Sequence, residues 1–499
     1  MHTERFRLRS FLQTLGAEEL ERHDDEIALA DVAAALEGNA RAVWFTRVGR
    51  EAAELAANVA GSRSRLALAF GTTSENLLAE VLRRLAGKGE TVELAREAAP
   101  AQQVLEREPD LTMLPVHLQH GLDGAPYISA SVDFAIDPAS GLTNVGIRRL
   151  MLRGRREAGV DLNAPSDLRA IYQASVARGA RLAIAFVVGS HPVDQVAATM
   201  RLPGDELRLI GALRAAPVPV VKCVTNEVRV PADAEYVLEG YLDERGYVEA
   251  EGPYGEFLGY YGGVKTNPVF HLTAITHRRD AVFQAATISG RTLGRTDTAQ
   301  LNALRAEVTV WRALETAVRG VRAVYATPSS GGAFNVRVAL EPRVPGEARN
   351  AISAVFGCLA NVKHVFVVDP DVDIFSSEQM DWALATRFQA ERDLIVAGGF
   401  RGMPLDPSLR GSRTGAKAGF DLTLPLGARA LESRVPEPPR FEGRRFDSLE
   451  AALADGPKFF VELMSATGSR DGREIVRALE ELRVAGRLKR DEQGRYLAA

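Results

Sequence analysis

The segment that most constrains the fold of this chain is Glu251-Gly-Pro-Tyr-Gly-Glu256, which continues as Phe-Leu-Gly-Tyr-Tyr261. Its glycines permit backbone conformations that a side chain would forbid, and its proline stiffens the link between them. Such a segment makes a poor helix and a poor central strand, so we expect a rigid loop that holds two carboxylates near one point. Paired carboxylates on a stiff loop are suited to proton transfer. The alternative is a surface turn with two solvated acids.

The bulk properties indicate a protein of several domains. A chain of 499 residues is long enough for about two to four domains, and a net charge of -4 gives no footprint for general nucleic-acid binding. The longest apolar runs, such as Leu182–Val188, are too short to span a bilayer, and the polar first residues lack the core of a signal peptide. Cys223 and Cys358 are the only cysteines, which excludes a disulfide framework. We expect a cytoplasmic protein without membrane or nucleic-acid partners.

Hydrophobic periodicity predicts a mixed α/β chain of several parts. Residues 1–110 form a predicted N-terminal α/β domain, with helices at Phe6–Leu15, Glu51–Asn58 and Leu77–Gly87 and strands at Ala42–Val48 and Leu66–Phe70. Residues 111–300 hold many strands with Gly and Pro punctuation, which favours a barrel-like β domain. These strands are expected at Tyr127–Phe134, Asn144–Leu152, Leu182–Val188, Val218–Val224, Ala234–Leu242 and Phe270–Ile275.

The C-terminal part returns to an α/β pattern. Residues 301–431 form a predicted α/β domain that opens with a strong helix over Leu301–Val318. A segment rich in Pro and Arg, residues 432–446, is a plausible linker. Residues 447–499 contain two predicted helices and a hairpin, which suggests a small winged-helix-like unit. Its charges are mixed rather than gathered on one basic face, so oligomer contact or lid covering is favoured over DNA binding.

Three further motifs accompany the Glu251–Tyr261 segment. They are Thr143-Asn-Val-Gly-Ile-Arg-Arg149, Gly189-Ser-His-Pro192, and Val230-Pro-Ala-Asp-Ala-Glu-Tyr-Val-Leu-Glu-Gly240. Taken in this order and spacing, the four motifs resemble the UbiD family of prenylated-FMN-dependent decarboxylases from about residue 110 to about residue 425. The resemblance implies that residues 111–300 form a split β-barrel of the flavin-reductase type that binds prenylated FMN.

The resemblance also implies a metal and cofactor site. Asn144, His191 and Glu235 match the three metal ligands of the family, and an amide oxygen, an imidazole and a carboxylate suit Mn²⁺ or Mg²⁺. A K⁺ ion is expected nearby, held by Glu235 and by carbonyls near Val224, Thr225 and Glu227. The residues expected around the cofactor are Asn144, Val145, Gly146, Ile147, Arg148, Arg149, Ser190, His191 and Glu235. Standing alone, His191 is better explained as a buried structural histidine, and the alternative for Glu235 is an exposed strand residue.

Arg149, Glu251 and Glu256 match the Glu-Arg-Glu network of the family. Glu256 is expected to protonate the carbon that loses CO₂, and Arg149 to orient both acids and attract the substrate carboxylate. The alternative is a structural salt-bridge cluster. Two departures concern the surroundings: Arg148 stands where an aromatic or small residue is common, and Gly357 lies near a lysine of fungal relatives that contacts the phosphate. Lys363 or Lys417 could substitute for that lysine.

The function that these features predict is reversible, non-oxidative decarboxylation of an aromatic, heteroaromatic or α,β-unsaturated acid, which makes the chain a carboxy-lyase. The alternatives are an ordinary FMN oxidoreductase and an inactive winged-helix regulator. The resemblance further implies a flavin prenyltransferase that supplies the cofactor, and a homodimer or hexamer built through about residues 300–430. Arg291 and Arg295 could read a second anionic group, which would favour a diacid. Otherwise they face solvent or a subunit interface.

Overall fold

The chain divides into two compact units, Met1–Thr423 and Leu424–Ala499. The computed structural model describes residues 3–359, 361–426, 433 and 435–499. Part of the predicted linker, residues 432 and 434, lies outside the described residues. Within these ranges, no helix combines the length and the apolar character needed to cross a membrane. The predicted mixed α/β architecture with several sheets is confirmed.

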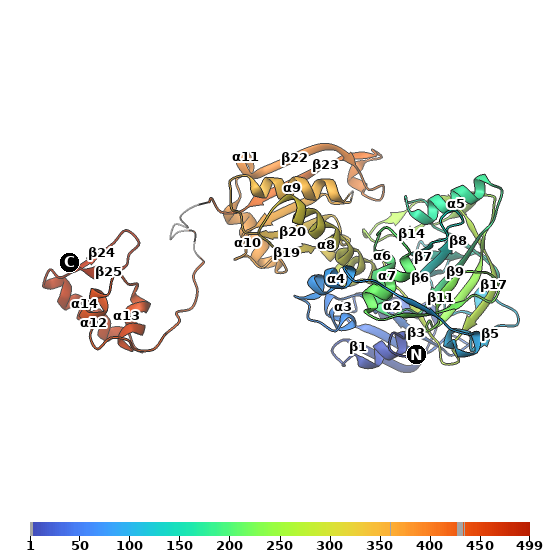
Figure 1. The fold of residues 1–499 in the computed structure, drawn as a ribbon, viewed down its shortest axis with the longest axis horizontal. Helices are drawn as coiled ribbons and strands as arrows, with labels where there is room; N and C mark the ends of the chain where they lie inside the picture. Colours follow the sequence, from blue (N-terminus) through green and yellow to red (C-terminus); the bar gives the residue numbers. More distant parts are fainter. Residues whose placement is uncertain (1–2, 360, 427–432, 434) are drawn as a thin grey trace. The chain divides into compact units, whose positions relative to one another are not determined.

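The N-terminal sheet of the first unit has the order β1-β2-β3-β18, so its last strand comes from far along the chain (Figure 1). The elements of this part are α1 (Leu8–Thr14), β1 (Leu20–Ile27), α2 (Leu29–Leu36), β2 (Ala42–Val48), β3 (Ala53–Ala57), α3 (Arg63–Phe70), α4 (Leu77–Leu85) and β18 (Val282–Ala285). β3 pairs antiparallel with β2 and parallel with β18. A domain boundary at residue 110 therefore does not describe how this sheet is built.

Two predictions in this part are wrong. Residues 51–58, predicted as a helix, contain strand β3, and Leu66–Phe70, predicted as a strand, ends helix α3. Alanine and leucine give β3 a high helix propensity, but its position between two strands overrides that preference. The apolar run of α3 is too short for periodicity to separate a buried strand from a buried helix. Its Ser62 cap, which accepts a hydrogen bond from Arg65 N, and left-handed Gly71 fix it as a helix.

The central barrel has six antiparallel strands in the order β12-β9-β6-β7-β8-β17, closed by pairing of β12 with β17. The strands are β6 (Tyr127–Ile136), β7 (Thr143–Leu152), β8 (Glu157–Val160), β9 (Leu182–Val188), β12 (Tyr236–Leu242) and β17 (Val269–His277). The connecting helices are α5 (Asp167–Ala177), α6 (Pro192–Thr199) and α7 (Glu206–Arg214). β10 (Val218–Lys222), predicted as another strand of this domain, belongs to a separate small sheet with β4 (Thr91–Glu93) and β11 (Arg229–Pro231).

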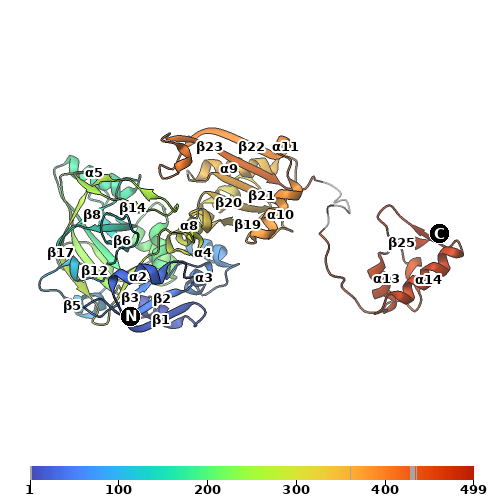
Figure 2. The same cartoon turned by 180° about the vertical axis from the view of Figure 1, so that it is seen from behind.

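The C-terminal sheet of the first unit has the order β19-β20-β21-β23-β22. Its elements are α8 (Asp297–Ala317), β19 (Val321–Ala326), β20 (Asn335–Leu340), α9 (Glu347–Cys358), β21 (His364–Val368), α10 (Ser377–Arg387), α11 (Ala390–Asp393), β22 (Leu394–Arg401) and β23 (Thr414–Leu422). In both views α9 lies beside β22 and β23, while α8 runs between this sheet and the helices of the barrel domain (Figure 2).

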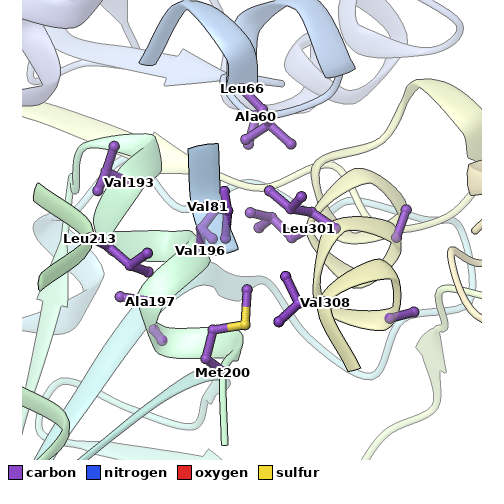
Figure 3. Close-up of a cluster of buried hydrophobic side chains, with 14 of the residues drawn as sticks. Ala60, Leu66, Val81, Val193, Val196, Ala197, Met200, Leu213, Leu301 and Val308 are labelled. Atoms are coloured by element: carbon purple, nitrogen blue, oxygen red, sulfur yellow. The ribbon is translucent and has the colours of Figure 1, made fainter. Parts of the chain in front are cut away.

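Helix α8 shares one apolar cluster with helices of the N-terminal part and of the barrel domain. Leu301 and Val308 on α8 pack in a cluster with Val196 of α6 and Val81 of α4, and Met200 closes the group (Figure 3). Each of these side chains is at least nine-tenths buried. Because each fully buried side chain contributes about 1.5–3 kcal/mol, this cluster fixes the segment after α6 against α8. That segment forms one wall of the cavity described below.

The second unit, Leu424–Ala499, contains three short helices and a two-stranded hairpin. They are α12 (Leu449–Ala454), α13 (Phe460–Thr467), α14 (Arg473–Val484), β24 (Leu488–Arg490) and β25 (Tyr496–Ala498). The unit has its own apolar core, which includes Leu453, Leu463 and Leu479. The predicted helices and hairpin are thus present, and the comparison with a winged helix stays a prediction.

Candidate active site

The Glu251–Tyr261 segment forms two short antiparallel pairs rather than an irregular loop. β13 (Glu249–Glu251) pairs with β16 (Lys265–Asn267), and β14 (Tyr254–Gly255) pairs with β15 (Tyr261–Gly262). Glu251 lies directly opposite Lys265 in this ladder. Gly252 joins the two pairs with a φ of 96°, in the region that favours glycine. The expected rigidity therefore comes from strand pairing as well as from the Gly-Pro corner.

Arg149 of β7 lies among three carboxylates. Its Nε is 3.0 Å from Oε1 of Glu251, its Nη2 is 2.9 Å from Oδ2 of Asp161, and its Nη1 is 3.2 Å from Oε1 of Glu256. The Arg149 side chain is only 13% exposed. The structure thus brings the three predicted residues Arg149, Glu251 and Glu256 together, and it adds Asp161, which the sequence analysis missed.

Two neutral side chains hold this cluster in place. The ring of Tyr254 lies 4.3 Å from the Arg149 guanidinium carbon, and its hydroxyl donates to Oε1 of Gln119 at 2.7 Å. Asn267 donates its amide to Oε2 of Glu251 at 3.1 Å. Because Glu251 already has two partners, its orientation is fixed. Glu256 has more freedom: its Oε1 contacts Arg149 only as an ion pair and has no hydrogen-bond partner among the described residues.

The surroundings of the cluster shift the pKa values of Glu256 and Asp161 in opposite directions. Burial raises the pKa of Glu256 above its ordinary value, and the positive charges of Arg149 and Lys265 offset this only in part. Burial would also raise the pKa of Asp161, but the same two cations outweigh it and hold that pKa below its ordinary value. Two carboxyl groups with oppositely shifted pKa values are the arrangement in which one is a proton carrier and the other a fixed charge.

A cavity of about 970 Å³ opens beside this cluster. Arg149, Glu256 and Lys265 line one part of it, and Gln195, Arg201 and Leu301 line another. The connection between β22 and β23, residues 401–413, supplies a further part of the lining. This volume is at the upper end of that usual for small-molecule and cofactor sites. Of the nine residues expected around a cofactor, Ile147, Arg148 and Arg149 line the cavity.

Asn144 at the start of β7 meets Glu206 in the first turn of α7. Nδ2 of Asn144 and the backbone N–H of Val145 both donate to Oε2 of Glu206, at 2.7 and 2.6 Å. Asp205 positions this contact, because it caps α7 and also accepts the backbone N–H of Thr143. Burial raises the pKa of Glu206 to about 7, with smaller contributions from the negative charges of Asp167 and Asp133.

Several oxygen atoms around this pair lack donors. Oδ1 of Asn144 and both carboxylate oxygens of Asp133 are buried without a hydrogen-bond partner among the described residues, although Nε of Arg148 lies 3.7 Å from Oδ1 of Asp133 as an ion pair. Orphaned buried acceptors are costly unless a cation satisfies them, and amide and carboxylate oxygens are ligands of Mn²⁺ and Mg²⁺. In the described part of the chain, no group of three His, Cys, Asp or Glu side chains is close enough to hold a metal by itself. The donor set therefore depends on Asn144 beside Glu206.

The structure places the other two predicted metal ligands in a different environment. His191 caps α6, and its ring packs edge-on against Phe6 and Phe11 with centroids 5.3 and 5.1 Å away. Glu235 is completely buried, and its carboxylate accepts hydrogen bonds from the Arg7 side chain and from the backbone N–H groups of Arg9 and Val282. No hydrogen bond or ion pair between described residues joins Asn144 to either of them.

The loop expected to help hold K⁺ also has another partner. The backbone N–H groups of Val224 and Thr225 donate to the carboxylate of Glu239 at 2.9 and 2.8 Å. Glu239, rather than Glu235, is thus the acid that this loop contacts, and its contacts are hydrogen bonds from N–H groups. Ser190, another residue expected near the cofactor, donates its N–H to Gln284.

Arg291 and Arg295 are not among the residues that line the large cavity. Arg291 is exposed, and Nη1 of Arg295 donates to the carbonyl of Gly38 at 3.2 Å. The two lysines considered for a phosphate have protein partners: Lys363 contacts Asp406, and buried Lys417 donates to two carbonyls at the end of α9. The cavity does contain Arg201, which makes no hydrogen bond or ion pair with another described residue.

The family comparison follows the division of the first unit. The models of the 3-octaprenyl-4-hydroxybenzoate carboxy-lyase N-terminal, Rift-related and C-terminal domains match residues 17–85, 92–292 and 299–422. The chain belongs to the UbiD family. Membership of this family makes it a carboxy-lyase, as the four motifs predicted. The second unit, Leu424–Ala499, lies beyond the matched segments.

Two curated UbiD relatives carry decarboxylase names. Anhydromevalonate phosphate decarboxylase of Methanosarcina mazei is 33% identical over 370 residues, which are 74% of this chain and 84% of that protein. Phenolic acid decarboxylase of Sedimentibacter hydroxybenzoicus is 29% identical over 459 residues, 87% of this chain and 95% of that protein. Their names concern two chemically different acids, so family membership leaves the substrate open.

Solved UbiD structures match the fold closely. The UbiD-class enzyme HmfF of Pelotomaculum thermopropionicum, in complex with FMN, superposes with a TM-score of 0.82 at 34% identity and covers 87% of this chain and 97% of its own. An evolved dimeric form of that enzyme, in complex with prFMN, gives a TM-score of 0.77 at 32% identity over the same shares of the two chains. The barrel-based architecture is therefore that of UbiD-class enzymes.

Proposed function

We propose that this UbiD-family protein catalyses reversible, non-oxidative decarboxylation of an aromatic, heteroaromatic or α,β-unsaturated acid with prenylated FMN. The observation that carries the proposal is the cluster of Arg149 with Glu251, Glu256 and Asp161 beside a cavity of about 970 Å³. An ordinary FMN oxidoreductase has no need of a buried acid with a raised pKa next to its flavin. An inactive regulator would not be expected to keep one.

The charges of the cluster support Glu256 as the proton donor. Arg149 and Lys265 carry two positive charges, and Glu251 and Asp161 carry two negative charges. The cluster is therefore neutral when Glu256 holds a proton, and the raised pKa of Glu256 agrees with this state. Loss of CO₂ leaves a carbon that needs one proton, which a neutral carboxyl group supplies. Glu256 lines the cavity, where its carboxyl group can reach a bound substrate.

Prenylated FMN supports the reaction by accepting the electrons that CO₂ leaves behind. FMN and prFMN complexes are known for the HmfF relative, and the cavity here has the volume for a flavin. Ile147 and Arg148 would lie against the cofactor, and Arg201 would meet its phosphate.

A divalent metal, Mn²⁺ or Mg²⁺, would be held by Asn144 and Glu206 rather than by His191 and Glu235. The unpartnered Oδ1 of Asn144 and the raised pKa of the adjacent Glu206 support this assignment. The carboxylate of Glu235 is already hydrogen-bonded to Arg7 and Val282, and the ring of His191 packs against Phe6. These contacts with the N-terminal segment favour structural roles for both residues. A flavin prenyltransferase would supply the cofactor, and a homodimer or hexamer remains the proposed assembly.

The test uses Glu256→Gln with Glu249→Gln as the matched control. Glu249 lies on β13 two residues before Glu251 and is half-exposed, so its substitution changes the same charge outside the cluster. Glu256→Gln should keep the flavin and lose turnover, because an amide cannot supply the proton. Wild-type turnover should fall as pH rises through the raised pKa of Glu256. Near-normal turnover by Glu256→Gln would refute the role.

A further inference from the structure

We propose that Lys265 binds the carboxylate of the substrate. The inference rests on the proposed decarboxylase function and names a residue that the four sequence motifs do not contain. It begins from the position of the departing group. Glu256 must protonate the carbon that loses CO₂, so the substrate carboxylate has to lie beside Glu256 within the cavity.

Arg149 is already shared among the acids of the protein. All three of its nitrogens face carboxyl groups, those of Glu251, Asp161 and Glu256, at distances of 2.9–3.2 Å. One face of its guanidinium is also covered by the ring of Tyr254. With Glu256 protonated, the charge of Arg149 is divided between Glu251 and Asp161, so a substrate carboxylate beside Glu256 calls for a second cation.

Lys265 has the opposite properties. Its Nζ lies 3.7 Å from Oε1 of Glu256 and 3.7 Å from Oδ2 of Asp161, close enough for attraction, and it makes no hydrogen bond with another described residue. The side chain is 30% exposed and lines the cavity. Strand pairing holds it there, because Lys265 is the cross-strand partner of Glu251. An ammonium group with three unused donors beside the proton donor is a carboxylate-binding group.

The chemistry predicts how this residue divides its effect between binding and turnover. The attraction between ammonium and carboxylate is full in the bound acid and weakens as the carboxylate becomes neutral CO₂. An interaction stronger in the ground state than in the transition state lowers KM without raising kcat. Loss of the lysine charge would also make Glu256 easier to protonate, which does not slow its donation.

The experiment compares wild type with Lys265→Met, Lys265→Arg and the control Lys222→Met, a half-exposed lysine paired with Glu227 on β10. Protein loaded with FMN, which lacks the prenyl-derived ring, is titrated calorimetrically with furan-2-carboxylate and 3,4-dihydroxybenzoate and with the primary amide of each. Wild type and Lys222→Met should prefer acid to amide. Lys265→Met should reduce that preference about tenfold or more, and Lys265→Arg should retain most of it.

Turnover with the prenylated cofactor supplies the second readout. Lys265→Met should raise KM by a similar factor with little change in kcat. An unchanged preference for acid over amide in Lys265→Met, or no such preference in wild type, would overturn the inference. A loss of kcat at constant KM would also overturn it, since that pattern belongs to a residue that only tunes Glu256. Wild-type turnover of any acid in the same preparation would leave the decarboxylase function standing in each of these cases.

Discussion

Replacement of Arg149 by Met should destabilise the first unit, because it leaves three carboxylates without their shared cation. The side chains of Glu251 and Glu256 are 1% and 7% exposed, and that of Asp161 is 20% exposed. Removal of one partner from a buried ion pair costs about 3–5 kcal/mol. The raised pKa of Glu256 lets this residue stay protonated and Lys265 remains near Asp161, so we place the loss at the lower end, about 3 kcal/mol.

The assay is urea denaturation at neutral pH, followed by circular dichroism, with free energies compared at a common m value. The double variant Arg149→Met/Glu251→Gln removes one unpaired carboxylate and should recover about 1–2 kcal/mol of the loss. Arg149→Lys keeps the charge but lacks the planar fork that contacts three acids, so it should lie between wild type and Arg149→Met. An Arg149→Met protein within 1 kcal/mol of wild type, or a double variant less stable than the single one, would refute this account of the cluster.

Three further outcomes are expected. Glu206→Gln should lose bound Mn²⁺ while Glu235→Gln retains it. Metal content of the wild type, measured by elemental analysis, should fall as the pH is lowered, because a proton on Glu206, whose pKa burial raises, competes with the metal. Metal loss only in Glu235→Gln would contradict the assignment. Arg291→Ala and Arg295→Ala should leave the ratio of diacid to monoacid turnover unchanged, since neither residue lines the cavity, and a shifted ratio would restore them as specificity residues. Light scattering should give a particle larger than the 54.0 kDa monomer, because edge strand β22 leaves backbone groups that can pair with another copy, and a monomer at micromolar concentration would count against this.

The parts of the fold that the sequence predicts well are those in which local pattern and tertiary position agree. Strand β9 is apolar throughout, β6 and β7 are rich in β-branched and apolar residues, and the predicted bounds of all three lie near the observed ones. The helix prediction for the residues of β3 is wrong because its alanines favour a helix, while the strands on either side of it require a strand. The pairing of β18 with β3 joins residues more than two hundred positions apart, and no local pattern indicates such a contact.

Some contacts of the candidate site can likewise be predicted from the sequence, and others depend on tertiary packing. Glu251 and Glu256 are separated by a short Gly-Pro corner, so their proximity follows from sequence. The contact of Asn144 with Glu206 spans 62 positions and depends on how α7 docks against β7. A signal was nevertheless present, since Asp205-Glu206 after Gly204 is typical of a helix start. His191 and Glu235 matched motifs in spacing, but spacing along the chain cannot reveal that the N-terminal helix supplies their partners.

The central claim, non-oxidative decarboxylation with a proton delivered by Glu256, is tested most directly by product analysis in D₂O. Protein co-produced with a flavin prenyltransferase is incubated anaerobically with a panel of aromatic, heteroaromatic and α,β-unsaturated acids, and CO₂ release and product mass are measured. The account predicts CO₂ and product in equal amounts, with one deuterium on the carbon that carried the carboxylate and no net oxidation. It also predicts that Glu256→Gln yields no product and no more than about one CO₂ per active site. A product that is oxidised, or one formed only when an electron acceptor is supplied, would contradict it.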